Sequence, residues 1–371
     1  MLTTRIAIIG GGLAGLHAAT LLERQGIAEY VLLEARNRLG GRIESLDLSA
    51  AETIAGDAVE RFDLGATWFW PEWQPQLAHL VAELGLETFE QDESGDMLIE
   101  RSAHDSPIRT DGYVSAVPSV RIVGGMRQLI ASLEQNLGLE RIVFGQKVLS
   151  LCQVGQQVEI SAADSSGRTC IYRVDQVLMA MPPRLAASLD FMPALPERLK
   201  DEWERTPTWM APHAKYVAVY KEPFWRKQGL SGFARSGAGP LCEIHDASSP
   251  GGHAALFGFF GIPAVSRARV PDEIMRQHCR AQLGRLFGKE ASVPVLDIIK
   301  DWAQEAHTAS KEDLNASGEH AVAPSFVIES GAWQGKLFGI ASEWSEHFSG
   351  YVAGAIEAAR QGITELLVRF R

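Results

Sequence analysis

The sequence predicts an α/β fold, and three observations near the N-terminus carry this prediction. Residues 6–9 form a short β-branched run of the kind found in strands buried on both faces. The run leads directly into residues 10–15, which fit the pattern G-x-G-x-x-G. Apolar residues at helical spacing follow as far as Gly26, and a second apolar run ends at Glu34. A strand, glycine turn, helix and strand in this order are typical of a Rossmann-like domain that binds a dinucleotide.

Each glycine of the turn has a distinct expected role. Gly10 permits the tight turn, Gly12 lets the backbone approach a pyrophosphate, and Gly15 lets the helix pack closely on the strand. Ala14 lies in the first turn of the helix, where backbone amides favour phosphate charge. Glu34 lies 34 − 15 = 19 residues beyond Gly15, the position from which an acid accepts hydrogen bonds from the adenosine ribose.

The bulk properties narrow the class of protein. A chain of 371 residues with 46% hydrophobic and 22% charged residues is an ordinary globular protein with room for two domains. Its net charge of −11 argues against a nucleic acid partner. We expect no membrane association, because no apolar run reaches spanning length and no signal peptide pattern opens the chain, and we expect a cytoplasmic protein. The four cysteines have no metal-ligand spacing, so we expect no metal site; they are Cys152, Cys170, Cys242 and Cys279.

Four further stretches resemble one family of proteins. Residues 34–42 read E-A-R-N-R-L-G-G-R, and residues 63–68 read D-L-G-A-T-W. Residues 215–227 begin with a lysine and contain Y-K-E-P-F-W-R-K, and residues 348–356 read F-S-G-Y-V-A-G-A-I. Together they resemble the flavin-containing amine oxidase (monoamine oxidase-like) family along nearly the whole chain. Ala66 and Ala353 depart from the glycine and the glutamate that are usual in this family.

The resemblance implies an FAD cofactor, bound without a covalent link because the anchoring cysteine of some relatives is absent. Arg36 and Arg42 are the candidates for the phosphate side, and Glu343 for the ribityl or ribose hydroxyls. The backbone amides of Tyr351 and Val352, at the start of the last helix, would face the flavin ring. The other residues expected to line the cofactor are Ala35, Gly41, Gly65, Ala66, Thr67 and, beside the adenine, Val148.

The resemblance also implies the catalytic residues. Lys215 would hold a water against the reactive flavin nitrogen and assist the reaction with dioxygen. Tyr351 would form one wall of an aromatic pair that aligns the amine. No tyrosine occupies the family's position for the second wall, so Trp302 or His307 are its candidates. Further candidates for the pocket lining are Trp68, Trp70 and Trp209, although tryptophans lie more often in cores.

The implied function is oxidation of a small amine to an imine, with dioxygen as acceptor and hydrogen peroxide as product. Two readings within the superfamily stay open: a flavin desaturase and a dihydronicotinamide oxidase. A third is a protein that binds FAD without oxidising anything. A homodimer is one expected assembly, because a second subunit could complete a site that has a short lid.

The family resemblance also predicts the domain organisation. Residues 1–75, 121–205 and 331–371 should form a discontinuous FAD-binding domain. Residues 76–120 and 206–330 should form a mixed-sheet α+β substrate domain. Between residues 95 and 119, where larger relatives carry a helical block over the substrate, the sequence is short and broken by proline and glycine, so we expect a reduced lid.

Overall fold

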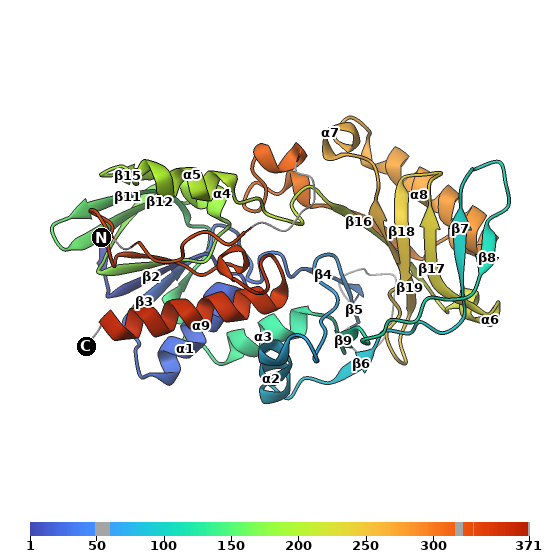
Figure 1. Ribbon diagram of the computed structural model, residues 1–371, viewed down its shortest axis with the longest axis horizontal. Helices are drawn as coiled ribbons and strands as arrows, with labels where there is room; N and C mark the ends of the chain where they lie inside the picture. The colour runs from blue at the N-terminus through green and yellow to red at the C-terminus, as the bar shows by residue number, and fades with distance from the viewer. Residues whose placement is uncertain (49–59, 316–321, 329, 370–371) are drawn as a thin grey trace.

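The computed structural model describes residues 1–48, 60–315, 322–328 and 330–369. The molecule is elongated and has two lobes, and the lobe at the left of Figure 1 contains the N-terminus and the last helix. The right-hand lobe is built from the middle of the chain. The expected α/β fold, a Rossmann-like domain joined to a mixed-sheet domain, is confirmed.

The first lobe is centred on a five-stranded parallel sheet. Its strands are short, and four of them are buried at every position: residues 6–9, 30–33, 176–179 and 337–339. Ile8 lies opposite Leu32 on one side and Leu178 on the other, and Leu178 lies opposite Phe338. Such continuous apolar strands are expected where both faces of a sheet are covered. The strand order is β10 (Ile142–Val143), β3 (Tyr30–Leu33), β2 (Ile6–Ile9), β14 (Gln176–Met179) and β21 (Leu337–Gly339).

Helices cover one face of this sheet. α1 packs along α9, and both bury apolar residues against Ile6, Ile8 and Phe338. α3 presents Leu129, Ile130 and Leu133 to the same core. Figure 1 shows α9 in front of α1, with α2 and α3 beside them. The bounds of these helices are α1 Leu13–Arg24, α2 Pro75–Glu83, α3 Arg127–Gln135 and α9 Val352–Arg369.

A second five-stranded sheet covers the other face. Its residues Leu151, Val158 and Ile160 share a core with Ile9 and Met179 of the parallel sheet. Two short helices, α4 (Pro183–Ala187) and α5 (Glu197–Arg205), lie at its edge. The strand order is β1 (Leu2–Thr3), β13 (Thr169–Val174), β12 (Gln157–Ala163), β11 (Lys147–Val154) and β15 (Asp190–Met192).

The second lobe is a seven-stranded mixed sheet. α8 (Asp272–Phe287) packs on one face through Met275, Cys279 and Leu283. The opposite face carries Val217 and Phe257 and packs on the hairpin of β4 (Ser45–Asp47) and β5 (Arg61–Asp63). The strand order is β20 (Leu296–Asp301), β16 (Ala214–Tyr220), β19 (Ala254–Phe260), β18 (Leu241–Asp246), β17 (Leu230–Ser236), β7 (Asp96–Glu100) and β8 (Ile108–Thr110).

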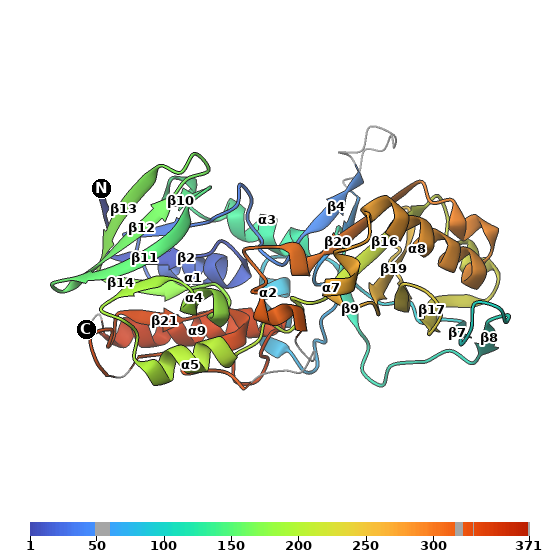
Figure 2. The same cartoon turned by 90° about the horizontal axis from the view of Figure 1, so that it is seen from above.

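The boundary between the lobes is where the site lies. Viewed from above, β4 and β20 lie between the two lobes (Figure 2). β6 (Thr88–Glu90) pairs with β9 (Val120–Ile122) near this boundary. From residue 84 to residue 126, a stretch that the structure describes in full, the chain forms strands and loops and no helix. The segment predicted to form a reduced lid therefore contains the β7–β8 hairpin and no helical block.

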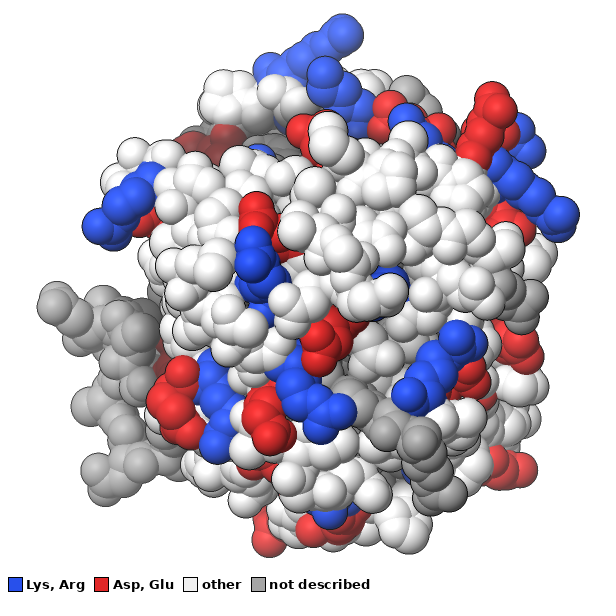
Figure 3. All heavy atoms as spheres, turned by 90° about the vertical axis from the view of Figure 1, so that its left-hand side faces the viewer, with Lys and Arg blue, Asp and Glu red and all other residues white. Residues whose placement is uncertain are grey.

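Two surface properties complete the description. Acidic and basic side chains are interspersed on the face shown in Figure 3. Within the described part of the chain, none of the helices has both the length and the apolar character needed to cross a membrane.

Candidate active site between the two lobes

The glycine-rich turn has the geometry that its sequence predicts. Gly10 has φ 112°, a conformation that L side chains rarely adopt. A Cβ atom on Gly15 would lie 2.0 Å from the Gly10 carbonyl oxygen, so the helix can pack on the strand only with glycine at this position. Gly12 forms the N-cap of α1, whose twelve residues present their first amides toward the same side. The turn therefore needs Gly10 and Gly15 for its own packing.

Gly12 differs, because the protein itself does not require a glycine there. A Cβ on Gly12 would meet nothing nearer than the Gly41 Cα, at 3.9 Å. Gly41 has φ 57° and faces Gly12 across a backbone bridge that joins Gly12 and Gly40. Two glycine backbones, at Gly12 and Gly41, thus face each other at the N-terminus of α1. This cradle fits a diphosphate, which needs close approach to backbone amides and the favourable end of a helix dipole.

Glu34 is tied to the same turn. Its carboxylate accepts hydrogen bonds from the backbone N–H of Gly11 at 2.7 Å and of Arg36 at 2.8 Å. The side chain is buried, and its backbone carbonyl accepts from the Gln146 amide at 2.8 Å. Each carboxylate oxygen keeps one lone pair for a further donor. The arrangement fixes an acceptor beside the cradle, where a ribose hydroxyl would lie.

The two arginines predicted for the phosphate side have partners within the protein. Arg42 forms a bidentate ion pair with Glu343, at 2.6 and 3.0 Å. Arg36 donates to Glu305 at 2.9 Å and to Thr308 at 3.1 Å. The resemblance assigned Arg42 and Glu343 to different parts of the cofactor, whereas here they neutralise each other. Their binding roles therefore stay predictions, and the pairing itself joins the segment after β3 to the segment before α9.

The remaining predicted cofactor residues lie near these elements. Val148 is buried on β11 at an irregularity in its pairing with β12. Ala14 is buried in the first turn of α1, and Ala35 follows Glu34 half-buried. A Cβ on Gly65 would lie 1.9 Å from the Arg42 carbonyl oxygen, which ties the segment after β5 to the arginine segment. Ala66, next to it, is half-buried.

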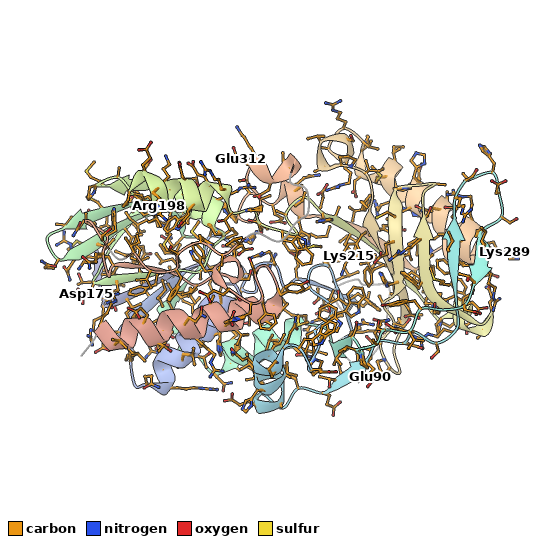
Figure 4. The ribbon with its side chains drawn as sticks, in the orientation of Figure 1. Glu90, Asp175, Arg198, Lys215, Lys289 and Glu312 are labelled. Atoms are coloured by element: carbon orange, nitrogen blue, oxygen red, sulfur yellow. The ribbon has the colours of Figure 1, made fainter. Side chains whose placement is uncertain are left out.

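Lys215 is the chemically most distinctive residue at the boundary. It lies on β16 between the two lobes (Figure 4) and is 3% exposed. Its Nζ donates to three oxygens at and just after the end of β5: the Asp63 carbonyl at 3.1 Å, the Gly65 carbonyl at 3.0 Å and Thr67 Oγ1 at 2.7 Å. Three acceptors match the three donors of an ammonium group. A buried lysine thus crosses from the mixed sheet to the segment expected to pass the flavin.

The surroundings of Lys215 lower its pKa toward neutral pH. Burial lowers the Lys215 pKa from 10.5 to about 7, while the Asp63 carboxylate opposes the shift and Arg121 adds to it. The Nζ also lies 4.2 Å from the centre of the Phe257 ring and 5.7 Å from that of Phe259. A buried cation with a pKa near 7 at a lobe boundary has the character of a catalytic group.

The sequence identified Asp63 only as part of a motif, but the structure places it in the Lys215 network. Its carboxylate is buried and accepts from Ser45 Oγ at 2.7 Å and from the Met126 amide at 2.9 Å. Burial raises the Asp63 pKa, and the Ser45 hydrogen bond and Lys215 oppose this. Phe257 and Phe259 were missed as well. Their alternation along a strand paired with β16 was the signal that could have placed them beside Lys215.

Tyr351 lies in an aromatic wall, which we define as Trp70, Tyr351 and Trp209. The Tyr351 ring centre is 5.1 Å from that of Trp209, tilted by 43°, and 6.4 Å from that of Trp70, nearly perpendicular. Gly350, with φ 82°, has the Trp209 side chain against it. The Tyr351 amide donates to the Phe348 carbonyl at 3.0 Å, whereas the Val352 amide, the first of α9, stays the predicted donor to the flavin.

The two candidates for a second aromatic wall have other surroundings. Trp302 is buried, donates from Nε1 to the Leu64 carbonyl at 3.1 Å, and has the Lys300 ammonium 4.7 Å above its ring. His307 has its pKa lowered by burial, then by Arg36. His307 therefore belongs to the side of the site around Arg36 and Glu34. Trp209 and Trp70, which the sequence suggested only as pocket lining, are the tryptophans whose rings neighbour Tyr351.

The fold defines a class of protein in which a Rossmann-like dinucleotide-binding domain adjoins a mixed sheet, and the candidate site lies where the two meet. The sequence matches the family described as flavin containing amine oxidoreductase over residues 98–362, and a NAD(P)-binding Rossmann-like domain over residues 8–84. The chain belongs to the flavin-containing amine oxidoreductase family. It is therefore a flavin-dependent oxidoreductase of the class that acts on amines.

Individual relatives agree with this assignment. The probable flavin-containing monoamine oxidase A of Dictyostelium discoideum is 24% identical, over 95% of each chain. Flavin-containing amine oxidase B of Canis lupus familiaris is 24% identical over 98% of this chain and 86% of its own. Among solved structures, putrescine oxidase bound to putrescine superposes with a TM-score of 0.79 at 20% identity, over 99% of this chain and 100% of its own. Cyclohexylamine oxidase from Brevibacterium oxydans gives 0.78 at 18%, over 99% of each chain.

Proposed function

We propose that this protein oxidises a primary or secondary amine to the imine, with dioxygen as electron acceptor and hydrogen peroxide as product. The observation that carries the proposal is Lys215, a buried ammonium held by three oxygens beside the cofactor lobe. The names of the relatives support the substrate class. In the balanced reaction the amine loses two electrons and two protons. Dioxygen takes up the two electrons and the two protons and becomes hydrogen peroxide.

Bound FAD would supply the electron chemistry by accepting a hydride equivalent from the carbon that bears nitrogen. The residues of the chain would orient the cofactor and stabilise the charges that develop during the reaction. The cradle of Gly12 and Gly41 would hold the diphosphate, and Glu34 would accept hydrogen bonds from the ribose. The N-terminus of α9, at Val352, would turn the positive end of its dipole toward the flavin and favour negative charge there. The three Lys215 donors are engaged by Asp63, Gly65 and Thr67, so the ammonium would act through its charge, by stabilising negative charge as it develops on dioxygen.

We propose that the FAD is bound without a covalent link. Cys152 and Cys170 lie on β11 and β13, Cys242 is exposed on β18, and Cys279 is buried on α8. These elements are separate from the glycine turn, the segment after β5 and the start of α9. A cytoplasmic location and a homodimer stay predictions from the sequence.

One observation favours a second candidate function. Trp209 and Tyr351 are in ring contact at 5.1 Å, ordinary packing for an aromatic pair. An amine that lies between two facing rings needs a gap there, so the contact favours a substrate that approaches from outside the pair. A flat hydride donor such as a dihydronicotinamide would do so. We keep dihydronicotinamide oxidation as the second candidate.

A peroxide-coupled assay separates the candidates. Purified protein, reconstituted with FAD, is screened against monoamines, diamines, amino acids and reduced nicotinamides. Peroxide formation with an amine, and little with the nicotinamides, is the expected result. Turnover of the nicotinamides alone would favour the second candidate, and peroxide from none of these compounds would contradict both.

A further inference from the structure

Asp63, the last residue of β5, connects the Lys215 site to two other elements of the fold. Its backbone carbonyl accepts a hydrogen bond from Lys215 Nζ at 3.1 Å. Its carboxylate accepts from Ser45 Oγ on β4 at 2.7 Å and from the backbone N–H of Met126 at 2.9 Å. One buried residue thus joins the candidate catalytic lysine to the β4–β5 hairpin and to the start of α3 in the first lobe.

The start of α3 is shaped to receive this carboxylate. Met126 is the N-cap residue of α3, and its own side chain forms no capping hydrogen bond. The positive end of the helix dipole favours a negative charge there. Gly125 has φ 81°, and a Cβ on it would lie 3.0 Å from Asp63 Oδ1, so a side chain at this position would crowd the carboxylate. The glycine before α3 therefore leaves room for an acidic group from a distant segment.

The charged groups around Lys215 come from three elements. Asp63 lies at the end of β5, and Arg121 lies on β9. Lys300 lies opposite Lys215 on β20 but pairs with Glu44 at 2.8 Å, and β19 presents phenyl rings to the ammonium. Burial and Arg121 lower the Lys215 pKa, and Asp63 is the group that raises it. Asp63 therefore supplies negative charge that balances the buried ammonium.

We propose that Asp63 is a positioning residue for Lys215, which keeps the ammonium charged and in place while dioxygen reacts. Its carbonyl binds the ammonium, and its carboxylate, held by Ser45 and the Met126 amide, provides the balancing charge. This inference rests on the proposed oxidation with dioxygen, because the charge of Lys215 acts in that step. Asp63 needs no contact with substrate or cofactor for this role.

The chain offers a replacement that removes the charge and keeps the geometry. Both hydrogen bonds to the carboxylate end on the same oxygen, Oδ1 of Asp63. The side-chain oxygen of an asparagine can accept the same two hydrogen bonds. The backbone carbonyl that binds Lys215 is unchanged by the replacement. Asp63→Asn therefore tests the charge of the residue with little change in its contacts.

The experiment measures flavin reoxidation in the holoenzyme, reduced anaerobically with dithionite and mixed with oxygenated buffer at a series of pH values. In the wild type the rate should decline with rising pH through an apparent pKa near 7. In Asp63→Asn the acidic plateau should be kept, but the decline should move to lower pH by roughly one unit or more, because an opposite charge near the lysine is lost. Near pH 7 the rate should fall by about fivefold as a result.

Two further variants accompany this measurement. Glu100→Gln is the matched control, because Glu100 is a buried carboxylate of the mixed sheet that pairs with Arg285 at 2.8 Å and is not among the charges that act on Lys215. It should leave the pH of the decline at the wild-type value. Ser45→Ala removes one of the two donors to Asp63 Oδ1 and should shift the decline in the same direction as Asp63→Asn, by a smaller amount.

The outcomes separate this inference from the proposed function. An unshifted decline in Asp63→Asn, or a rate lowered equally at all pH values, would overturn the role of Asp63 and leave oxidation with dioxygen standing. If Asp63→Asn does not fold, Ser45→Ala decides in the same way.

A wild-type rate without any pH-dependent decline would instead contradict the proposed role of Lys215 in the step with dioxygen. Melting temperatures, measured at a pH where Lys215 is charged, then decide whether the two residues act together. A smaller loss from Asp63→Asn in the Lys215→Met background than in the wild-type background supports the inference, because the unbalanced buried charge is absent there. Equal losses in the two backgrounds refute it.

Discussion

Replacing Lys215 with methionine removes a buried cation while nearly keeping the side-chain volume. The change deletes three hydrogen bonds, to the Asp63 and Gly65 carbonyls and to Thr67 Oγ1. We expect the reduced flavin to react more slowly with dioxygen, because the first electron transfer creates a negative charge that Lys215 would stabilise. Reduction by the amine should change less, since that step builds no comparable charge beside the lysine.

The size of the effect follows from the environment of the ammonium. The Lys215 pKa falls from 10.5 to about 7, and at roughly 1.4 kcal/mol per pKa unit this corresponds to about 5 kcal/mol of unfavourable burial for the charge. Charge interactions in so poorly screened a site are strong. If half of that energy, about 2.5 kcal/mol, is recovered when dioxygen becomes negative, the reoxidation rate falls by about 10²-fold on removal of the charge.

The sign of the pH dependence follows from the same pKa. Below about pH 7 Lys215 carries its proton in the folded protein, and above it the side chain is neutral. Wild-type reoxidation should therefore be fast at acidic pH and should decline through an apparent pKa near 7. The methionine variant, which has no group to titrate here, should be slow at all pH values and should lack this step.

Stopped-flow absorbance measures the rate directly, by mixing anaerobically reduced enzyme with oxygenated buffer at a series of pH values. Lys300→Met is the matched control, because Lys300 lies opposite Lys215 on β20 and is also largely buried, but it pairs with Glu44 at 2.8 Å. An unchanged rate in Lys215→Met, or an equal fall in Lys300→Met, would refute the assignment.

Three further predictions concern the cofactor. Gly12→Ala should fold with a wild-type circular dichroism spectrum but lose FAD affinity, since its Cβ meets no protein atom within 3.9 Å, whereas Gly15→Ala should lower the melting temperature because its Cβ would lie 2.0 Å from a carbonyl. Glu34→Gln should weaken FAD binding by about tenfold, because an amide cannot accept from both backbone donors; fluorescence titration measures this, and wild-type affinity would contradict it. Heat denaturation should release all FAD into the supernatant, and yellow precipitated protein would argue for a covalent link.

The sequence predicted the fold well where local pattern and packing agree. The glycine turn, the buried four-residue strands and the helices over residues 13–24 and 352–369 all follow from apolar runs bounded by glycine. Lys215 was identified because a long motif surrounds it, and the structure places it at the lobe boundary. In both cases the information lies in contiguous residues.

The partners of the site residues could not be predicted in the same way. Arg42 lies 301 positions from Glu343, and Arg36 lies 269 positions from Glu305, so nothing local marks these pairs. The contact of Trp209 with Tyr351 likewise joins the segment before β16 to the segment before α9, which are far apart in the sequence. Such interactions become visible only when the topology brings distant segments together.

The contacts that cross the lobe boundary also limit how a substrate can enter. Lys215 is bonded to the segment after β5, Arg36 to Glu305, and Lys300 to Glu44. A hinge opening of the whole molecule would break all of these buried or half-buried bonds together. Entry past residues 111–119, the chain that leads from the β7–β8 hairpin at the far edge of the mixed sheet to β9, disturbs none of them. Diffusion into the site would then be governed by a single short surface stretch, and turnover by larger amines should depend on its length.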